Sequence, residues 1–451
     1  MEMSAPGTHG PWVAFLQSML NKAYGQNLVV DGVFGPATQA AVETMRLLEG
    51  APGGSAASVW DILAPAIAGV TPHAVTAADT LDSLAQAHDI HPALIVAANP
   101  GVDFTARLSG TVRLPQRWSV VNADLPYTWR VMQLNLMALK RRYPFIKIFS
   151  AGKSVLGRTL YGVRVGDGEH RVAYNAAHHA NEWINTPMLM IFIETLCKTA
   201  VLQGRIEGYT VGNLLSTHRY DIIPMVNPDG VDLVTGGIGP VRGSEPMSGE
   251  PLISDNPMLD CDLMANNITS DNDFYHFAKA ACARDGIPFP GGWKANAHGV
   301  DLNLQYPAGW ESARDIKAQM GITRPAPRDY VGPAPLCEPE SQAMAAFTKA
   351  GDYRLTLSHH SQGREIYWKF GEHNPPLSEL IGKFFASLSG YTLSTTPPES
   401  GNAGYKDWFI QEYNRPAYTV ETGQGCCPLD TAQLAEITQE NMGVLLLGGL
   451  V

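Results

Sequence analysis

Several features that mark other classes of protein are scarce in this sequence. Its 451 residues contain six cysteines, too few for a dense disulfide framework at this length. Basic residues are outnumbered, with 32 Lys and Arg against 43 Asp and Glu, and the net charge of −11 argues against nucleic acid or an anionic membrane surface as the main partner. The apolar run at 444–451 is far too short to span a bilayer, so no membrane span is expected.

The sequence does contain enough apolar material for more than one domain. Hydrophobic residues make up 45% of the chain, and 451 residues predict two or three domains. Residues 8–66 are expected to form a small helical domain, because the apolar residues of 12–20 and 39–48 recur at helical spacing. Between them, 31–38 reads Asp-Gly-Val-Phe-Gly-Pro-Ala-Thr, where Asp-Gly favours a tight turn and the proline opens the next helix.

Both N-terminal units resemble known wall-binding modules. The turn at 31–38 between two amphipathic helices resembles the peptidoglycan-binding domain of cell-wall hydrolases, although it also fits any helix-turn-helix unit. Residues 70–116 follow the order strand, helix, helix, strand and resemble a LysM module, which binds N-acetylglucosamine chains. The opening of this unit lacks the tyrosine and glycine usual in LysM modules, so an ordinary α+β linker domain is the alternative.

Residues 124–451 alternate between apolar strands and helices, which predicts one α/β domain around a buried mixed sheet. The expected strands are 147–149, 159–165, 171–175, 220–226, 354–360 and 417–421. The expected helices are 128–143, 187–203, 339–350, 379–388 and 431–447. The segment 236–292 is rich in proline, glycine, aspartate and asparagine, and is expected to be an irregular functional rim.

The most informative stretch is His-Ala-Asn-Glu at 179–182. His179 and Glu182 stand three residues apart, so on a helical turn they face one point and can hold two corners of a tetrahedral zinc ion. A third ligand must come from elsewhere, and a catalytic site leaves the fourth corner open for water. Taken alone, however, this motif is weak, and a hydrogen-bonded structural histidine is the better explanation of His179.

An ordered set of motifs after residue 182 changes that balance. They are Asn-Pro-Asp-Gly at 227–230, Trp-Lys-Ala-Asn at 293–296, Gly-Val-Asp-Leu-Asn at 299–303, His-Ser-Gln-Gly at 360–363 and Tyr-Thr-Val-Glu at 418–421. Functional groups at strand ends of an α/β sheet meet in one crevice. In this order the motifs resemble the zinc carboxypeptidase family of metallopeptidases. The stretches 293–305, 360–368 and 404–409 resemble its branch of γ-D-glutamyl-L-diamino acid endopeptidases, which cut bacterial wall stem peptides.

The resemblance implies a metal site. His179, Glu182 and His360 match the family's three zinc ligands, so one Zn²⁺ is expected per chain. The adjacent His359 is the alternative to His360 as the third ligand. Asp301 matches the carboxylate that holds a ligand histidine in the right tautomer, and a turn-capping aspartate is its ordinary explanation.

The resemblance also implies two groups that act on the substrate. Glu421 matches the family's general base, which takes a proton from the attacking water and passes it to the leaving amine. Lys294 stands where the family has an arginine that steadies the developing oxyanion, and a lysine supplies a point charge in place of a planar fork. Outside this set of motifs, the ordinary explanation of Glu421 would be a salt-bridged acid, and that of Lys294 a solvated lysine.

The clearest departure from the family pattern is Leu304. Carboxypeptidases carry Asn-Arg where this chain has Asn303-Leu304, and that arginine clamps the terminal carboxylate of the substrate. The loss of this cation predicts an endopeptidase, whose substrate continues past the cut bond. Arg364 and Arg415 are candidates for a replacement cation or for binding other substrate carboxylates. Tyr405, near the position of the family's mobile tyrosine, either contacts substrate or packs as an ordinary aromatic.

The sequence therefore predicts a modular peptidoglycan hydrolase that cuts the γ-D-glutamyl–diaminopimelate amide of wall stem peptides. The alternatives are a metallocarboxypeptidase that trims wall peptides and a catalytically dead wall-binding scaffold. A wall hydrolase is expected to be secreted or associated with the cell wall. Residues 1–7 have neither the basic end nor the apolar core of a secretory leader, so a cytoplasmic or sporulation-related location is also consistent with the sequence.

Overall fold

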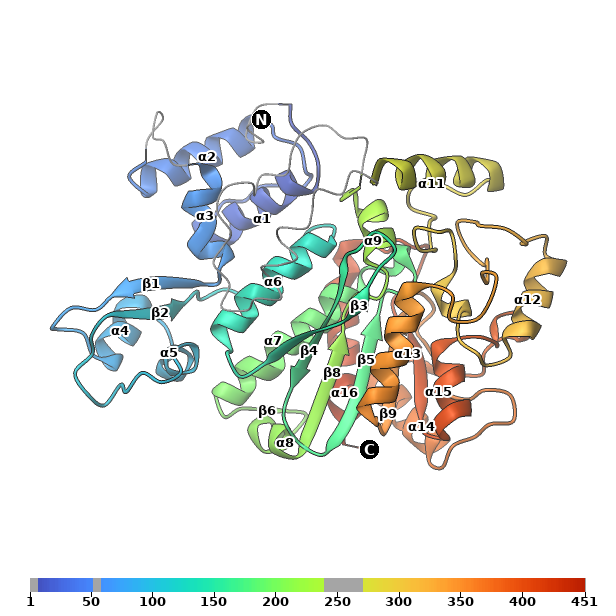
Figure 1. The fold of residues 1–451 in the computed structure, drawn as a ribbon. Coiled ribbons are helices and arrows are strands. Elements are labelled where there is room, and N and C mark those ends of the chain that lie inside the picture. The colour runs from blue at the N-terminus through green and yellow to red at the C-terminus, as the bar shows by residue number, and fades with distance from the viewer. Residues whose placement is uncertain (1–6, 52–57, 239–270, 451) are drawn as a thin grey trace.

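The computed structural model describes residues 7–51, 58–238 and 271–450 (Figure 1). Within these ranges the largest body is built on one mixed sheet of eight strands. Its strands are β3 (Lys147–Lys153), β4 (Thr159–Val165), β5 (His170–Ala176), β8 (His218–Ile223), β9 (Leu355–His360), β10 (Glu365–Tyr367), β11 (Thr392–Ser394) and β12 (Ala417–Glu421). Their order across the sheet is β11-β10-β12-β9-β5-β8-β4-β3, and β12, β9, β5 and β8 run parallel to one another.

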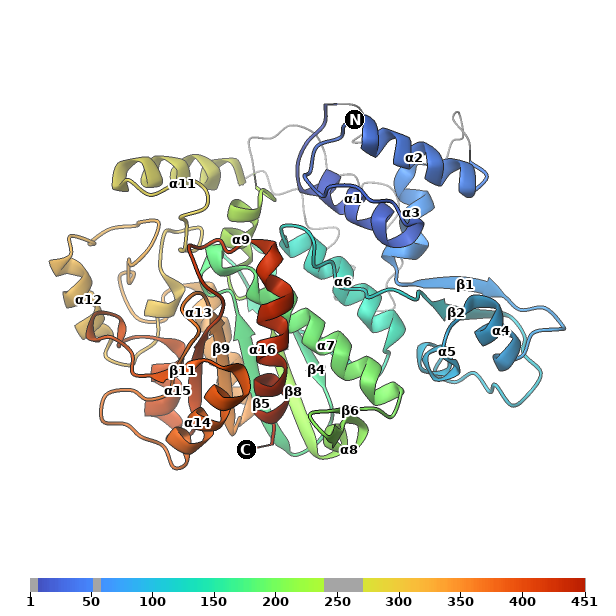
Figure 2. The same ribbon diagram turned by 180° about the vertical axis from the view of Figure 1, so that it is seen from behind.

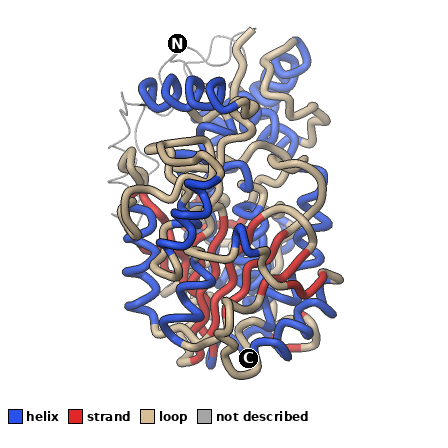
Figure 3. Tube along the Cα trace, turned by 90° about the vertical axis from the view of Figure 1, so that its right-hand side faces the viewer, coloured by secondary structure: helices blue, strands red, loops and turns tan. Residues whose placement is uncertain are grey.

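Helices cover both faces of this sheet (Figures 1 and 2), and Figure 3 shows the strands as a twisted layer between them. One face is covered by α6 (Trp129–Arg142), α7 (Asn185–Val201), α14 (Ser378–Ser389) and α16 (Leu434–Leu447). The other is covered by α13 (Pro339–Gly351) and α15 (Tyr405–Tyr413). The hydroxyls of Tyr174 and Tyr220 each donate to a carbonyl of α16 at 2.7 Å. Because both faces are covered, every residue of β9 is buried, as the predicted α/β fold requires.

Shorter elements connect the sheet to its helices. They are α8 (Val211–Thr217), α9 (Pro228–Thr235), α11 (Asp271–Asp285), α12 (Trp310–Gln319), the hairpin of β6 (Arg205–Ile206) and β7 (Tyr209–Thr210), and the 3₁₀ turns η1 (Ala180–Glu182), η2 (Leu302–Leu304), η3 (Pro398–Ser400) and η4 (Thr431–Gln433). Within the described ranges, none of the helices has both the length and the apolar character that crossing a bilayer requires.

The expectation of an irregular segment at 236–292 is wrong for α11. This helix buries Phe274, Ala278, Ala281 and Cys282, which recur at helical spacing. Three of the four are small, so their stripe is a weak apolar signal against the polar residues around it. Residues 239–270 of the same segment lie outside the described residues.

The N-terminal helices α1 (Pro11–Tyr24), α2 (Pro36–Leu48) and α3 (Val59–Ile67) include the two predicted from apolar spacing. The turn between α1 and α2 is held by the buried side chain of Gln17, which donates to Asp31 Oδ1 at 2.8 Å and accepts from the Gly32 backbone N–H at 2.9 Å. Gly32 has φ of 69°, and a Cβ there would lie 3.0 Å from the Gly10 carbonyl oxygen. A glycine is therefore required at this point of the turn.

These helices pack directly onto the large α/β body. Phe15 and Met19 of α1 share one buried cluster with α6, and they line a small cavity together with Ala138 of that helix. Ser18 Oγ donates to Asp124 Oδ1 at 2.7 Å, and Lys22 Nζ donates to the Val121 carbonyl at 2.8 Å. The N-terminal helices and α6 therefore form a continuous core.

The second N-terminal unit has the predicted order of strand, helix, helix and strand. It consists of β1 (Val70–Ala74), α4 (Leu81–His88), α5 (Pro92–Ala98) and β2 (Thr111–Pro115), with β1 and β2 antiparallel. A separate small core fills it, built from Leu84, Ile95, Val112 and Leu114 among others. This unit projects from the side of the molecule (Figure 1).

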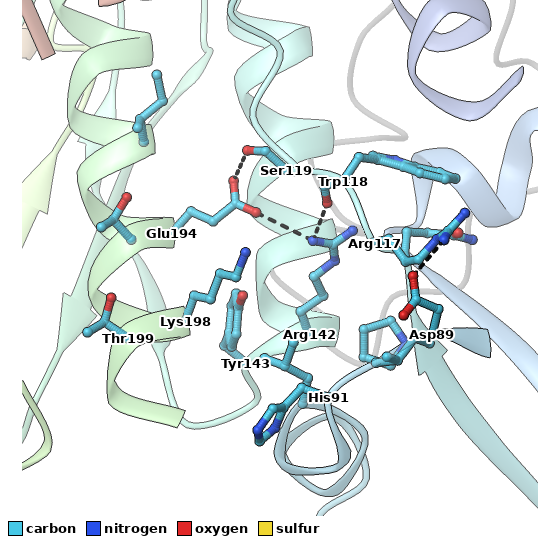
Figure 4. Close-up of a pocket in the computed structure, with 16 residues that line it drawn as sticks. Asp89, His91, Arg117, Trp118, Ser119, Arg142, Tyr143, Glu194, Lys198 and Thr199 are labelled. Carbon is cyan, nitrogen blue, oxygen red and sulfur yellow. Dashed lines mark hydrogen bonds and ion pairs between the residues drawn. The ribbon is translucent and has the colours of Figure 1, made fainter. Parts of the chain in front are cut away.

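A buried ion pair fastens the chain on both sides of this second unit (Figure 4). Arg142 Nη1 of α6 lies 3.4 Å from Glu194 Oε1 of α7. Arg142 donates to the carbonyls of Gly69 at 2.9 Å and Trp118 at 2.7 Å, and Glu194 accepts from Ser119 Oγ at 2.6 Å. A cavity of about 400 Å³ lies beside the pair, and none of the residues predicted for catalysis lines it. The buried charges of Arg142 and Glu194 therefore hold the segments that connect the second unit to the rest of the chain.

Candidate metal centre and active site

The residues predicted for catalysis meet at the ends of neighbouring parallel strands. His179 follows β5, His360 is the last residue of β9, and Glu421 is the last residue of β12. The sheet places these strands side by side, with Glu421 in register with His360. Glu182 ends the turn η1 that follows β5. The crevice at the carboxyl ends of parallel strands is where open α/β sheets bind ligands.

Three side chains bring potential metal-binding atoms together at this crevice. The Nδ1 atoms of His179 and His360 lie 2.9 Å from Glu182 Oε1 and Oε2 respectively, and 3.2 Å from each other. Tetrahedral zinc with bonds of about 2.0–2.1 Å separates its ligand atoms by about 3.3 Å. Two imidazoles and a carboxylate are also a ligand set that zinc uses in hydrolytic enzymes.

The surroundings of the three residues fit a bound cation. His179 Nε2 lies 3.0 Å from Asp301 Oδ1, so the Nδ1 atom is left facing the metal position. Burial lowers the pKa of His179, but the carboxylates of Glu182 and Asp301 outweigh it and raise that pKa to about 9. The same carboxylates that favour a proton on this ring favour a metal ion in its place. Asp301 thus stands where a carboxylate that orients a ligand histidine is expected.

The structure brings His360 to the cluster and leaves His359 outside it. Successive residues of a strand point to opposite faces, so only one of the two can reach the crevice. The ring of His359 is fully buried, neither of its nitrogens has a hydrogen-bond partner among the residues that the structure describes, and burial lowers its pKa to about 3. Of the two histidines, His360 is the one whose ring lies with His179 and Glu182.

Lys294 reaches the cluster from the loop after Trp293. Its Nζ lies 3.0 Å from Glu182 Oε1, and its carbonyl accepts from the Ala180 backbone N–H at 3.0 Å. Burial works against a charged ammonium, but Glu182 and Asp301 raise the pKa of Lys294, which keeps it positive at neutral pH. A fixed positive charge beside the metal ligands can stabilise a developing oxyanion.

Glu421 lies on the wall of the crevice and is not one of the clustered metal-binding groups. Burial and the nearby charge of Glu182 raise the pKa of Glu421 to about 8. A carboxyl that titrates close to the working pH can both accept a proton and give it back.

Asn303 and Leu304 both line the same pocket. Asn303 Oδ1 accepts from the Tyr405 backbone N–H at 3.1 Å. Leu304 packs in an apolar cluster with Trp310, Ala313 and other residues and is 8% exposed. Tyr405 has no exposed surface because its ring packs in a buried aromatic cluster, so it is a packed aromatic and not part of the pocket lining within the described residues.

Arg364 and Arg415, predicted to bind substrate carboxylates, are not brought to the pocket, whose lining in the described part of the chain includes neither. Arg364 is engaged by Glu440 and lies over the ring of Tyr391 at 5.6 Å. Arg415 donates to Asp352 Oδ1 at 2.7 Å. It precedes β12, at the opposite end of that strand from Glu421, which explains its distance from the crevice.

The pocket has a volume of about 520 Å³ and contains charged and phenolic residues to which the sequence motifs gave no individual role. They are Lys317, Arg328, Asp329, Tyr367, Lys406 and Asp407, the last three within the stretches 360–368 and 404–409 that resemble the endopeptidase branch. Arg328-Asp329 lies in a proline-rich loop, where an isolated charged pair is a weak local signal. Lys317 lies on α12, and a lysine on a helix ordinarily belongs to a solvated face, so the sequence gave no reason to single it out.

Sequence comparisons match most of this chain to known proteins. The family model described as zinc carboxypeptidase matches residues 133–443. Gamma-D-glutamyl-L-diamino acid endopeptidase 1 of Lysinibacillus sphaericus is 38% identical over 333 residues, which cover 73% of this chain and 74% of that protein. The uncharacterized protein YqgT of Bacillus subtilis (strain 168) is 34% identical over 306 residues, covering 67% of this chain and 72% of its own length.

Among solved structures, carboxypeptidase A from Helicoverpa armigera is similar at a TM-score of 0.49 and 18% identity. That similarity covers 82% of this chain and 78% of the insect protein.

Proposed function

The chain belongs to the zinc carboxypeptidase family of metallopeptidases, and from this premise we propose that it cuts the γ-D-glutamyl–diaminopimelate amide of bacterial wall stem peptides. The family uses zinc, and His179, Glu182 and His360 are the residues we propose to hold it. The name of the Lysinibacillus relative, an endopeptidase for γ-D-glutamyl-L-diamino acids, supports this choice of bond.

One observation carries the choice of endopeptidase over carboxypeptidase. Leu304 presents an apolar side chain to the pocket at the place where carboxypeptidases carry a carboxylate-binding arginine. Leu304 is 8% exposed and packs against Trp310, so this position supplies no charge to the pocket. A substrate that continues through an amide past the cut bond needs no cation there.

The proposed reaction divides the work among a few side chains. Zinc bound by the three ligands would polarise the scissile carbonyl and lower the pKa of a water to about 7. Glu421, on the wall of the crevice, accepts the proton of the attacking water and returns it to the leaving amine. Lys294 holds a positive charge beside the carbonyl oxygen as negative charge develops there. Asp301 keeps the His179 ring in position throughout.

We also propose that units 8–66 and 70–116 bind the wall polymer, which would place the protein at the cell wall. Tethering linked sites to one polymer can raise avidity by about 10²–10⁴ without any new contact at the active site. The complete ligand set with Glu421 and Lys294 counts against a catalytically dead scaffold.

The test compares wild type with Leu304→Arg on L-Ala-γ-D-Glu-diaminopimelate with and without a following D-Ala. We expect wild type to cut the longer peptide at least as well as the shorter one, by kcat/KM. The arginine should lower that activity, because it adds another charge to a wall that already carries Lys317 and Arg328. Leu304→Met, which keeps the side chain apolar and similar in volume, is the control and should change little. Strong preference of wild type for the shorter peptide, with its free carboxylate, would contradict the endopeptidase assignment.

A further inference from the structure

Arg328 differs from the other cations that line the catalytic pocket in the described part of the chain. The other three are lysines whose ammonium groups are already engaged. Lys294 pairs with Glu182 at 3.0 Å, Lys317 pairs with Asp329 at 2.8 Å, and Lys406 pairs with Asp407. Arg328 uses only its Nε, which donates to Asp329 Oδ2 at 3.1 Å. Its two terminal nitrogens have no hydrogen-bond partner among the described residues, and its side chain is 46% exposed.

The loop that carries Arg328 is tied to the metal site. The backbone N–H of Asp329 donates to Asp301 Oδ2 at 3.2 Å, while Oδ1 of the same Asp301 faces His179. The side chain of Asp329 is held in turn by Lys317, whose side chain is almost fully buried. Asp329 therefore fixes Arg328 through a chain of bonds that begins at a proposed zinc ligand.

The position of Arg328 suits a group close to the reacting bond. The positive charge of Arg328 lies close enough to Lys294 to act against the protonated form of that lysine and so to lower its pKa. Lys294 is the residue that we place beside the developing oxyanion. A guanidinium whose Nε is anchored still offers two parallel N–H donors, the geometry that binds a carboxylate in bidentate fashion. Such a group in a substrate pocket is suited to an anionic substrate, since no carboxylate of the described residues pairs with its two terminal nitrogens.

We propose that Arg328 binds a free carboxylate of the substrate through its two terminal nitrogens and thereby determines which peptides are cut. This inference rests on the proposed function, because the substrate it requires is a γ-glutamyl peptide. A γ-linkage leaves the α-carboxylate of the D-glutamyl residue free a few bonds from the cut amide, where an ordinary α-linked peptide has none. A diaminopimelate residue brings a second carboxylate at the far end of its side chain. Arg328 binds one of these two groups.

The experiment measures kcat/KM on four peptides of the form L-Ala-γ-D-Glu-X-D-Ala. The glutamyl α-carboxylate is either free or converted to its amide, and X is either diaminopimelate or lysine, which lacks the far carboxylate. Wild type is compared with Arg328→Gln and Arg328→Lys. Arg314→Gln is the matched control, because Arg314 also pairs with the aspartate that follows it but does not line the pocket within the described residues. Thermal melting of each variant checks that it remains folded.

We expect wild type to lose about 10- to 100-fold in kcat/KM when the bound carboxylate is removed from the substrate. Arg328→Gln should show the same loss on the peptide that keeps this carboxylate, and no further loss on the peptide without it. Arg328→Lys should restore only part of the activity, and Arg314→Gln should behave as wild type. The pair of peptides that shows this pattern identifies the carboxylate.

Two other outcomes would each overturn the proposal in a distinct way. An equal effect of Arg328→Gln on all four peptides, or no effect on any, would mean that Arg328 does not bind a substrate carboxylate, while the proposed function would stand. Failure of wild type to cut any of the four peptides would overturn the proposed function, and this inference would fall with it.

Discussion

His179 and Asp301 are joined by a 3.0 Å hydrogen bond between Nε2 and Oδ1, across a sequence separation of 122 residues. Asp301 also accepts from the backbone N–H groups of Asn303 at 3.1 Å and Asp329 at 3.2 Å. One carboxylate thus fixes the ring of a proposed zinc ligand and the loop that carries Arg328. The metal site and the substrate-binding wall share a single anchor.

The first prediction concerns this anchor. Asp301→Asn should weaken zinc binding by about 10- to 100-fold, because the His179 ring loses the partner that sets its tautomer. Wild type should hold one zinc per chain. Zinc affinity measured by competition with a chelator tests this, with Asp315→Asn, an exposed aspartate on α12, as the control. Unchanged affinity in Asp301→Asn would show that the ring is oriented by other contacts.

The second prediction concerns Glu421. Glu421→Gln should retain zinc, since this side chain is not one of the clustered metal-binding groups, but should lose about 10²–10⁴ in kcat, or more if one group serves both proton transfers. Metal analysis and steady-state kinetics on a soluble stem peptide provide the measurement. Glu412→Gln, at an exposed position on α15, serves as the control. Activity within tenfold of wild type would assign the general base to another residue.

The third prediction concerns the N-terminal helices. Phe15 is 1% exposed and belongs to the core shared with α6, so Phe15→Ala should lower the free energy of unfolding by about 3–5 kcal/mol. Phe384→Ala, at a position on α14 that is 47% exposed, should change it by less than about 0.5 kcal/mol. Urea denaturation measures both. A small effect at Phe15 would mean that the N-terminal helices fold independently of the α/β body.

The same packing changes the expected outcome of deleting residues 1–120. If 8–66 and 70–116 were separate modules, as the sequence predicts, their removal would leave hydrolysis of small muropeptides intact. In the structure, their removal uncovers the apolar surface of α6 and the Arg142–Glu194 pair. The truncated protein should therefore be less stable as well as weaker in binding insoluble wall, and substitutions within the modules are the cleaner test of wall binding.

The fourth prediction concerns pH. Burial, followed by the charge of Asp229, raises the pKa of Glu340 from its ordinary 4.5 to about 8. The folded state therefore holds a proton that the unfolded state releases above pH 4.5. The stability contributed by this group is fully present below about pH 4.5 and falls by about 1.4 kcal/mol per pH unit as the pH rises toward 8.

Glu340→Gln should remove this part of the pH dependence, because an amide cannot ionise. Urea denaturation of wild type and variant at several pH values between 5 and 8 makes the comparison, and Glu379→Gln, an exposed residue paired with Lys383, is the control. Parallel stability curves for wild type and Glu340→Gln would show that Glu340 is ionised in the folded protein.

Much of the catalytic domain was predictable because its strands and their terminal residues obey local rules. Buried parallel strands leave continuous apolar runs, and polar residues at their ends, such as His360 and Glu421, must then lie at the crevice. The ordered motifs also predicted the three side chains that the structure clusters, which we propose as the zinc ligands. Local sequence patterns could not predict where the side chains of Arg364 and Arg415 lie, because their partners, Glu440 and Asp352, are distant in sequence.

The features that the sequence did not reveal depend on contacts between distant segments. The importance of Arg328 arises only when its loop meets Asp301 and the pocket forms around both. The joint core of α1 and α6 was hidden for a similar reason: α6 is buried on nearly all sides, and its sequence does not say which element covers each side.

Mass analysis of the products from purified muropeptides tests the central claim most directly. The zinc-loaded full-length protein should release L-Ala-γ-D-Glu and leave diaminopimelate with a new free amine, and Glu421→Gln should release neither. Release of a single C-terminal residue by wild type, or no cleavage by protein that holds one zinc per chain, would contradict the account.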